Sequence, residues 1–235
     1  MLEVNRINSF YDKSHVLHDV SLEAHESEIV GILGRNGVGK STTLKSIMGI
    51  VRPKAGSIKF NGKEVVGLQP YQMARLGVGY VPEDRRIFPT LTVRQNLLLG
   101  MKSGQKQKSQ SGWTIEKIYH FFPELGQRDS FRGGNLSGGE QQMLTIGRTL
   151  MGDPSLILID EPTEGLAPQV VETVVNVIEE IHSSGVSVLL VEQSMDVVMD
   201  LAEAVIIMNK GEIVYKGTPG ELQASPDIIE TYLEI

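Results

Sequence analysis

The sequence predicts an α/β fold with a mainly parallel core sheet, and three observations support this prediction. Strand-sized apolar runs, each nearly uninterrupted, occur at residues 29–33, 156–159, 186–191 and 204–208. Uninterrupted runs of this length are typical of parallel strands that are covered on both faces. Helical patterns, such as residues 40–48 and 169–182, lie between these runs and close near a glycine. Alternation of strands with helices indicates a layered α/β sheet.

Two stretches depart from this alternation. About the first 66 residues, including "VSLEA" and "GSIKFNGKEV", alternate in polarity and turn at glycine, which predicts a small antiparallel sheet. Residues of about 93–150 contain no buried-strand pattern and are expected to form an inserted helical subdomain. Within them, "KSGQKQKSQSG" is polar and of low complexity, so we expect a mobile loop there. We find no internal repeat and no linker, so we expect one domain over residues 1–235.

The composition narrows the class of protein. The chain has 235 residues, is 40% hydrophobic and carries a formal net charge of −7, with no cysteine. The acidic balance argues against non-specific nucleic-acid binding, and the absence of cysteine excludes disulfide and thiolate chemistry. The first residues lack a signal-peptide pattern, and no apolar run approaches the ~20 residues of a membrane helix. We therefore expect a soluble protein that reaches a membrane only through a partner.

A phosphate-binding loop follows the first apolar run. "GRNGVGKS" matches G-x-x-x-x-G-K-[ST] in full, with a strand before it and a helix after it. Glycines let successive backbone N–H groups converge on phosphate oxygens, and the helix N-terminus adds its positive dipole. Lys40 is expected to reach the β- and γ-phosphates, and the Ser41 hydroxyl to bind Mg²⁺. The nucleotide-binding residues predicted here are Gly34, Arg35, Asn36, Gly37, Val38, Gly39, Lys40, Ser41 and Thr42.

A pair of acids follows the second apolar run, in "LILIDEPTEG". We expect this strand to lie beside the strand of the phosphate-binding loop, which would bring Asp160 to the Mg²⁺ shell. Glu161 is then expected to orient and polarise the attacking water, which makes it the catalytic base. The alternative is a pair of acids in a polar turn after a core strand, but the phosphate-binding loop favours catalysis.

A second glycine-bearing loop, "NLSGGEQQ", also opens a helix. By the same physics it could bind an anion, or Ser137 could simply cap the helix with Glu140 completing a capping box. In order, the phosphate-binding loop, "LSGGEQQ" and "LILIDEP" resemble the ATP-binding cassette (ABC) family over the whole chain, and "LSGGE" matches the signature motif of that family. The resemblance implies a P-loop NTPase fold and two cassettes that pair head to tail. Each ATP would lie between one phosphate-binding loop and the partner's signature loop, here Ser137, Gly138, Gly139 and Glu140.

Further family positions can be matched residue by residue. Tyr11 stands where the family has an aromatic residue that stacks on adenine, although it could simply be a sheet residue, and Val16 would line the same pocket. Residues 164–168 stand where the family has the D-loop, at the dimer interface.

Two positions depart from the usual pattern of the family. Glu83 replaces the glutamine that contacts Mg²⁺, and Gln193 replaces the histidine that contacts the γ-phosphate. An amide can donate a hydrogen bond, but it cannot become cationic as histidine can.

The segments "GYVPEDRRIFPTLTVRQNL", "DEPTEGLAP" and "VLLVEQ" sharpen the resemblance toward the second ATPase of bacterial branched-chain amino acid importers. Close relatives serve urea, short amides, other neutral amino acids or aromatic acids. The resemblance implies two permease subunits, a paralogous ATPase or a second copy of this chain, an external binding protein, and a place at the cytoplasmic face of the membrane. The loop at residues 83–89 and the helical subdomain would receive the permease's coupling helices.

Three rival functions would each explain part of the sequence. A soluble ABC ATPase of DNA repair or translation would need a coiled-coil insertion, a second cassette or a basic face, and the sequence has none of them. A GTPase would use "NKGE" at residues 209–212 to read guanine, but a turn between two strands explains these residues better. A catalytically silent regulatory cassette is the third, and a phosphate-release assay would distinguish it.

Overall fold

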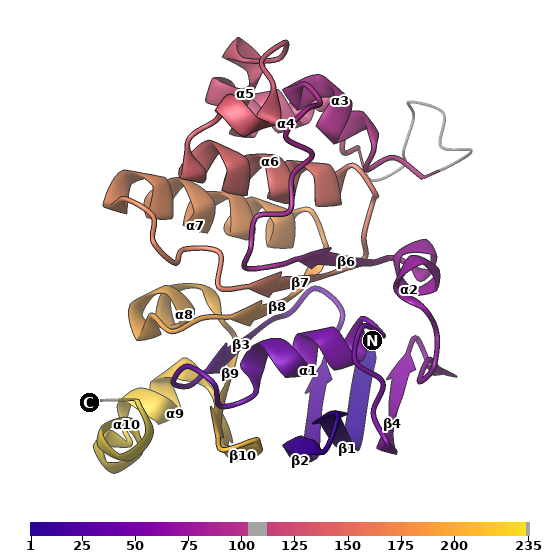
Figure 1. Ribbon diagram of the computed structural model, residues 1–235. Coiled ribbons are helices and arrows are strands. Elements are labelled where there is room, and N and C mark those ends of the chain that lie inside the picture. Colours follow the sequence, from indigo (N-terminus) through magenta and orange to yellow (C-terminus); the bar gives the residue numbers. More distant parts are fainter. Residues whose placement is uncertain (103–111, 234–235) are drawn as a thin grey trace.

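The computed structural model describes residues 1–102 and 112–233 (Figure 1). The polar segment at residues 102–112, expected to be a mobile loop, lies outside the described residues apart from its two ends. Within the described ranges, no helix combines the length and apolar character that crossing a bilayer requires.

The amino-terminal segment forms the predicted antiparallel sheet. Its strands are β1 (Leu2–Tyr11), β2 (Ser14–Ala24), β4 (Ala55–Phe60) and β5 (Lys63–Glu64), in the order β2-β1-β4-β5. The turn between β4 and β5 contains Asn61 and Gly62, both with left-handed backbone conformations. A tight hairpin needs positive φ at these positions, and Asn and Gly adopt it most readily.

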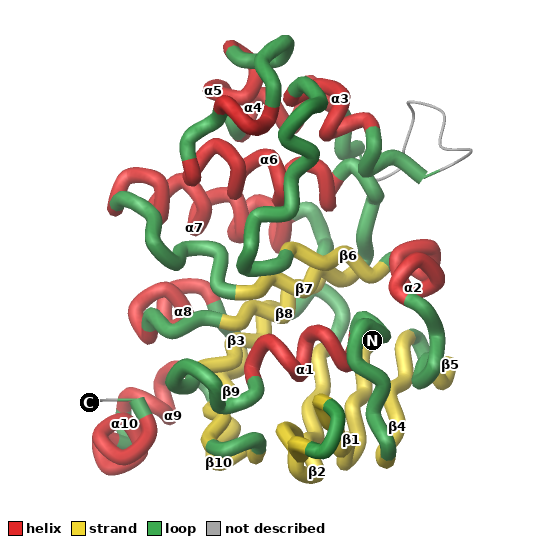
Figure 2. The backbone as a smooth tube through the Cα atoms, viewed as in Figure 1, coloured by secondary structure: helices red, strands yellow, loops and turns green. Residues whose placement is uncertain are grey.

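The core sheet has six strands in the order β10-β9-β3-β8-β7-β6 (Figure 2). All neighbours are parallel except β9 and β10, which form an antiparallel hairpin. Lys210 and Gly211 make its turn with φ of 47° and 83°, so the "NKGE" segment is a hairpin turn. The strands are β3 (Ile29–Leu33), β6 (Val78–Val81), β7 (Leu156–Asp160), β8 (Ser187–Val191), β9 (Ala204–Asn209) and β10 (Glu212–Gly217).

One expectation about this sheet is wrong. The strand that ends in Asp160, β7, is not the neighbour of β3, because β8 lies between them. Asp160 still reaches the phosphate-binding loop, because α1 (Lys40–Ile47) crosses from the end of β3 and contacts β7. Strand order in a parallel sheet depends on the crossover connections, which the motif spacing does not encode.

The core strands bury both faces, as their apolar runs predict. Alternate residues of β8 illustrate this: Val188 and Leu190 join one hydrophobic core, and Leu189 and Val191 join the other. The first core packs against α6 (Gly138–Leu150), α7 (Pro168–Ser183) and α8 (Met195–Leu201), and the second packs against α1 and the antiparallel sheet. Figure 1 shows α1 between the two sheets and α6 and α7 over the opposite face of the core sheet.

The remaining helices surround this centre. Residues 93–150 form α3 (Val93–Leu98), α4 (Ile115–Phe121), α5 (Pro123–Gln127), η1 (Gly133–Asn135) and α6, with no named strand among the residues described there. Figure 1 shows α3, α4 and α5 beyond α6, on the side of α6 that faces away from the core sheet. The other three are α2 (Pro70–Leu76), α9 (Pro219–Gln223) and α10 (Pro226–Tyr232).

Candidate nucleotide-binding and catalytic site

The phosphate-binding loop connects β3 to α1 and depends on its glycines. Gly34 has φ of 150°, and a Cβ there would lie 2.5 Å from the backbone oxygen of Met208. Gly39, the N-cap of α1, has φ of 111°, and a Cβ there would lie 2.8 Å from Leu17 Cδ2. A larger residue at either position would combine a strained backbone with a collision, so the close wrap of this loop requires glycine.

Lys40 lies inside the loop and is only 3% exposed. Its Nζ donates to the carbonyl oxygens of Gly34 at 2.6 Å and Arg35 at 3.1 Å, and lies 3.1 Å from Glu161 Oε1. The ammonium is thus held in the cradle by neighbouring oxygens, and the phosphate-binding loop carries a buried positive charge at its centre.

Asp160 lies at the end of β7 and is fully buried. Ser41 Oγ donates to Asp160 Oδ1 at 2.8 Å, and Tyr80 Oη donates to Asp160 Oδ2 at 3.1 Å. Burial raises the pKa of Asp160, although both hydrogen bonds oppose the shift. The predicted pair, Ser41 and Asp160, is therefore in direct contact, and both side chains offer oxygen atoms.

Glu161 follows directly and has a left-handed backbone, with φ of 46°. Gln193 Nε2 donates to Glu161 Oε2 at 2.6 Å, while Lys40 pairs with the other oxygen. Burial opposes ionisation of Glu161, but the Gln193 hydrogen bond and the Lys40 ammonium outweigh it and hold the pKa of this carboxyl below its ordinary value. Glu161 is therefore an ionised carboxylate at neutral pH, as a general base must be.

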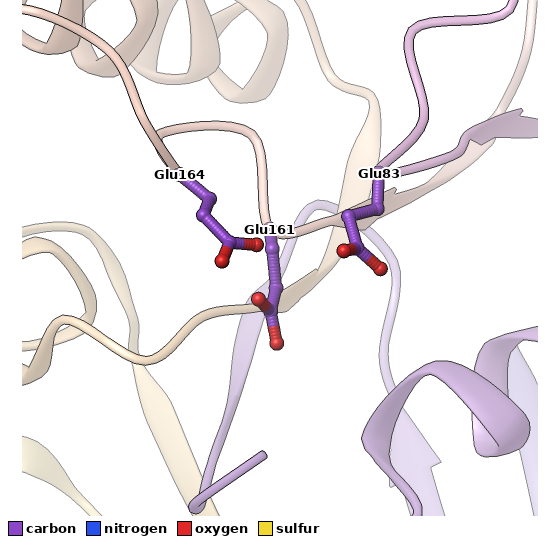
Figure 3. A group of neighbouring side chains, drawn as sticks. All are labelled: Glu83, Glu161 and Glu164. Atoms are coloured by element: carbon purple, nitrogen blue, oxygen red, sulfur yellow. The ribbon is translucent and has the colours of Figure 1, made fainter. Parts of the chain in front are cut away.

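Two further carboxylates approach Glu161 (Figure 3). Glu83 follows β6, and Glu164 lies on the same loop as Glu161; each of the three offers an oxygen within 4.8 Å of the others. The carboxyl contact with Glu161 raises the pKa of Glu164. All three carboxylates line a cavity of about 270 Å³, whose lining residues are Val16, Asn36, Gly37, Gly39, Lys40, Ser41, Thr42, Glu83, Glu161 and Glu164.

The signature segment lies elsewhere, at the start of α6. Ser137 and Glu140 form the capping box that the sequence offered as an alternative to an anion site. Ser137 Oγ accepts from Glu140 N at 3.3 Å, and Glu140 Oε2 accepts from Ser137 N at 2.8 Å. Glu140 Oε1 also pairs with Arg128 Nε at 2.9 Å. None of the four signature residues lines the cavity above. The chain thus carries two separate glycine-bearing helix N-termini.

The remaining predicted residues lie near the cavity edge or outside its lining. Val16 lines it, but Tyr11, at the end of β1, does not and is 45% exposed. Gly34, Arg35, Val38 and Gln193 are not among the residues that line the cavity, and Gln193 contacts the lining residue Glu161.

Three polar side chains of this region were missed by sequence reasoning. Tyr80 holds Asp160, Arg85 Nη2 donates to the carbonyl oxygen of Glu164 at 2.9 Å, and Glu192 accepts from Thr163. Tyr80 lies within β6, Glu192 directly follows β8, and Arg85 lies in the loop four residues after the end of β6. That position was the only available signal, because the carboxyl ends of parallel strands meet at one edge of a sheet.

The arrangement can bind an anion and can activate water. The glycine loop, the α1 N-terminus and Lys40 attract phosphate, while Ser41 and Asp160 offer the hard oxygen ligands that Mg²⁺ takes. Beside them, an ionised and oriented Glu161 can accept a proton from water.

The comparisons with known proteins agree with this geometry. The sequence model of the ABC transporter family matches residues 17–164. The chain is 40% identical to the high-affinity branched-chain amino acid transport ATP-binding protein BraG of Pseudomonas aeruginosa, over 99% of each chain. It is 32% identical to the probable branched-chain amino acid transport ATP-binding protein LivF of Archaeoglobus fulgidus, over 94% of each chain. It is also 32% identical to the lipopolysaccharide export system ATP-binding protein LptB of Haemophilus influenzae, over 99% of this chain and 97% of the relative.

Solved structures show the same fold. An ATP-binding subunit of an ABC transporter superposes with a TM-score of 0.85 at 26% identity, over 97% of this chain and 94% of the other. An ATP-binding cassette of an ABC transporter in its ADP conformation superposes with a TM-score of 0.82 at 25% identity, over 98% and 97%.

Proposed function

This chain belongs to the ABC transporter ATPase family, and we propose that it drives uptake of branched-chain, hydrophobic amino acids through a membrane permease by hydrolysing ATP. The cargo is proposed from the relatives. The branched-chain relative of Pseudomonas aeruginosa is 40% identical, whereas the lipopolysaccharide export relative of Haemophilus influenzae is 32% identical. Uptake of labelled leucine by vesicles that contain the reconstituted transporter would support this cargo. Uptake of urea or an aromatic acid in its place would contradict it.

One observation carries the enzymatic part of the proposal. Lys40, the Ser41–Asp160 pair and the Glu161–Gln193 pair converge at the carboxyl edge of the core sheet, although they come from three separate strand ends. Lys40 would exchange its carbonyl contacts for the β- and γ-phosphates. Glu161 would accept the proton of the attacking water, with Gln193 fixing the orientation of its carboxylate.

We propose that Ser41, Asp160 and Glu83 hold the Mg²⁺ of MgATP. A hydroxyl and two carboxylates are donors that Mg²⁺ prefers, and bound Mg²⁺ would neutralise phosphate charge. Tyr11 would stack on adenine at the exposed end of β1, with Val16 beside it. Stacking tolerates any base, so the preference for ATP is a separate measurement.

We further propose that the signature loop serves a second cassette. Ser137, Gly138 and Gly139 lie outside the cavity that contains Lys40, so they cannot complete the same half-site within one chain. In a head-to-tail pair they would meet the γ-phosphate held by the partner, which is either a second copy or a paralogue. The D-loop residues 164–168 would lie at this seam.

We propose that a groove beside the loop at residues 83–89 binds the permease. It encloses about 560 Å³ between α2, β6 and the carboxyl end of α6. Exposed apolar side chains line it, including Ile50, Phe88 and Leu99, which are 49%, 48% and 55% exposed. Arg148 Nη1 is buried there and has no hydrogen-bond partner among the described residues. An apolar helix with a carboxylate fits this lining, so the occupant would be a cytoplasmic helix of the permease. An external binding protein would act through the permease.

Phosphate release by the purified chain, alone and with the permease complex, tests the proposal. The parent should release phosphate from MgATP, and Glu161→Gln, which is isosteric but cannot accept the proton, should release little. Phe88→Asp should still bind nucleotide but should no longer bind the permease. If neither the parent nor Glu161→Gln released phosphate, even with the permease, the enzymatic function would be refuted.

A further inference from the structure

Glu192 is a buried carboxylate to which the proposed mechanism assigns no role. It lies directly after β8 and is 2% exposed. Its Oε1 accepts from Thr163 Oγ1 at 2.8 Å and from Thr163 N at 3.1 Å, and its Oε2 accepts from Gln193 N at 3.2 Å. One side chain thus joins the loop after β7 to the loop after β8.

No cation compensates this carboxylate: within residues 1–102 and 112–233 it makes no ion pair, and its partners are neutral N–H and O–H groups. Burial raises the pKa of Glu192, the hydrogen bonds from Thr163 and Gln193 oppose the shift, and the charge of Glu161 adds to it. A buried acid without a counter-ion is costly, and such groups cluster at functional sites.

The segment that Glu192 holds contains the strained residue of the site. Glu161 has φ of 46°, a left-handed conformation that a non-glycine residue keeps only where its surroundings impose it. Glu161 N donates to Val191 O at 2.9 Å, which fixes one end of the turn. Glu164 N donates to Glu161 O at 3.3 Å, a long bond. Beyond Glu161, the two bonds from Thr163 to Glu192 fix the middle of the turn, and the 2.9 Å bond from Arg85 Nη2 to the carbonyl oxygen of Glu164 fixes its far end. The contacts with Glu192 therefore hold the part of the turn closer to Glu161.

We propose that Glu192 is a positioning residue, which holds the 161–164 turn and the backbone of Gln193 together so that Glu161 keeps its strained, inward orientation. This inference rests on the proposed role of Glu161 in hydrolysis. Without Glu192, the turn relaxes and the Glu161 carboxylate loses alignment with the γ-phosphate, while the phosphate-binding loop is untouched. The loss therefore falls on turnover and not on nucleotide binding.

The test compares Glu192→Ala and Glu192→Gln with Thr163→Val in the chain assembled with its permease. Turnover and the MgATP dissociation constant are measured for each. Glu192→Ala should lower kcat at least tenfold and change the dissociation constant less than threefold. Glu192→Gln should lie between it and the parent, because its amide oxygen still accepts from Thr163 while its NH₂ faces the N–H of Gln193. Thr163→Ser should retain the parent kcat, because it keeps the hydroxyl.

A double-mutant cycle separates positioning from general destabilisation. Thr163→Val should lower kcat severalfold in the parent and have no further effect in Glu192→Ala, because Glu192→Ala already removes the acceptor of the Thr163 hydroxyl. Thr173→Val, whose hydroxyl donates to the carbonyl oxygen of Gln169 in α7, is the matched control and should leave kcat unchanged. The inference would be overturned if the kcat losses of the two single variants multiplied in the double variant, or if the kcat of Glu192→Ala stayed within twofold of the parent. Equal losses of kcat and of MgATP affinity would also overturn it. An inactive parent would instead refute the proposed function, so the two failures are distinguishable.

Discussion

Replacing Gln193 with alanine tests how the Glu161 carboxylate is held. The change removes the hydrogen bond from Nε2 to Glu161 Oε2, which is 2.6 Å long, and leaves the Lys40 contact at 3.1 Å. A hydrogen bond to a charged group contributes about 1.5–3 kcal/mol. If the transition state depends on that orientation, kcat falls by about tenfold to a hundredfold. Gln193 touches no residue of the phosphate-binding loop in the described contacts, so the MgATP dissociation constant should change little.

The same variant predicts a shift in pH dependence. The Gln193 hydrogen bond lowers the pKa of Glu161, so its removal raises that pKa. A base with a higher pKa becomes protonated at higher pH, and the acid limb of the kcat profile should therefore move to higher pH. The assay is steady-state phosphate release across pH, with nucleotide binding measured in parallel. Gln193→His, which restores a donor, should retain more activity than Gln193→Ala. Equal turnover of Gln193→Ala and parent, with an unmoved acid limb, would refute the reasoning.

Three further substitutions and one control have defined outcomes. Lys40→Ala should abolish the rise in melting temperature that MgATP gives the parent, because binding to the folded state is what produces that rise. Tyr80→Phe removes the donor to Asp160 Oδ2, and should raise the Mg²⁺ concentration at half-maximal turnover severalfold. Gly100→Ala places a Cβ 1.9 Å from the backbone oxygen of Arg148 and should destabilise the fold by about 2 kcal/mol. Gly220→Ala meets nothing within 4 Å and should leave the melting temperature within about a degree. A stable Gly100→Ala, an MgATP-stabilised Lys40→Ala or an unchanged Mg²⁺ dependence of Tyr80→Phe would contradict the respective contact.

Most of the fold could be predicted from the sequence, because its signals are local. The run at residues 29–33 forms β3 with the expected bounds, and those at 156–159, 186–191 and 204–208 differ from the observed strands by one residue. Buried parallel strands are apolar along their whole length, so composition alone marks them. The order of those strands could not be predicted in the same way. The place of β8 between β3 and β7 follows from chain crossovers and three-dimensional packing.

The site was predictable where a motif carries the chemistry and not where packing does. Lys40, Ser41, Asp160 and Glu161 converge as the motifs predict. Tyr80 and Glu192 contribute through single long-range contacts, and no local pattern distinguishes them from other residues near strand ends. The left-handed backbone of Glu161 was also not predictable, because glutamate has no preference for positive φ. The division into domains and the roles of the individual site residues stay predictions.

The central claim is that ATP binds at an interface to which two cassettes each contribute one half, and ATP-dependent association tests it most directly. Glu161→Gln, saturated with MgATP, should form a dimer by light scattering, alone or with the companion cassette and permease. The same chain with Gly138→Glu added should bind ATP with unchanged affinity but remain monomeric, because only the signature half of the seam is altered. A persistent monomer of Glu161→Gln with every companion, or a dimer that tolerates Gly138→Glu, would contradict the account.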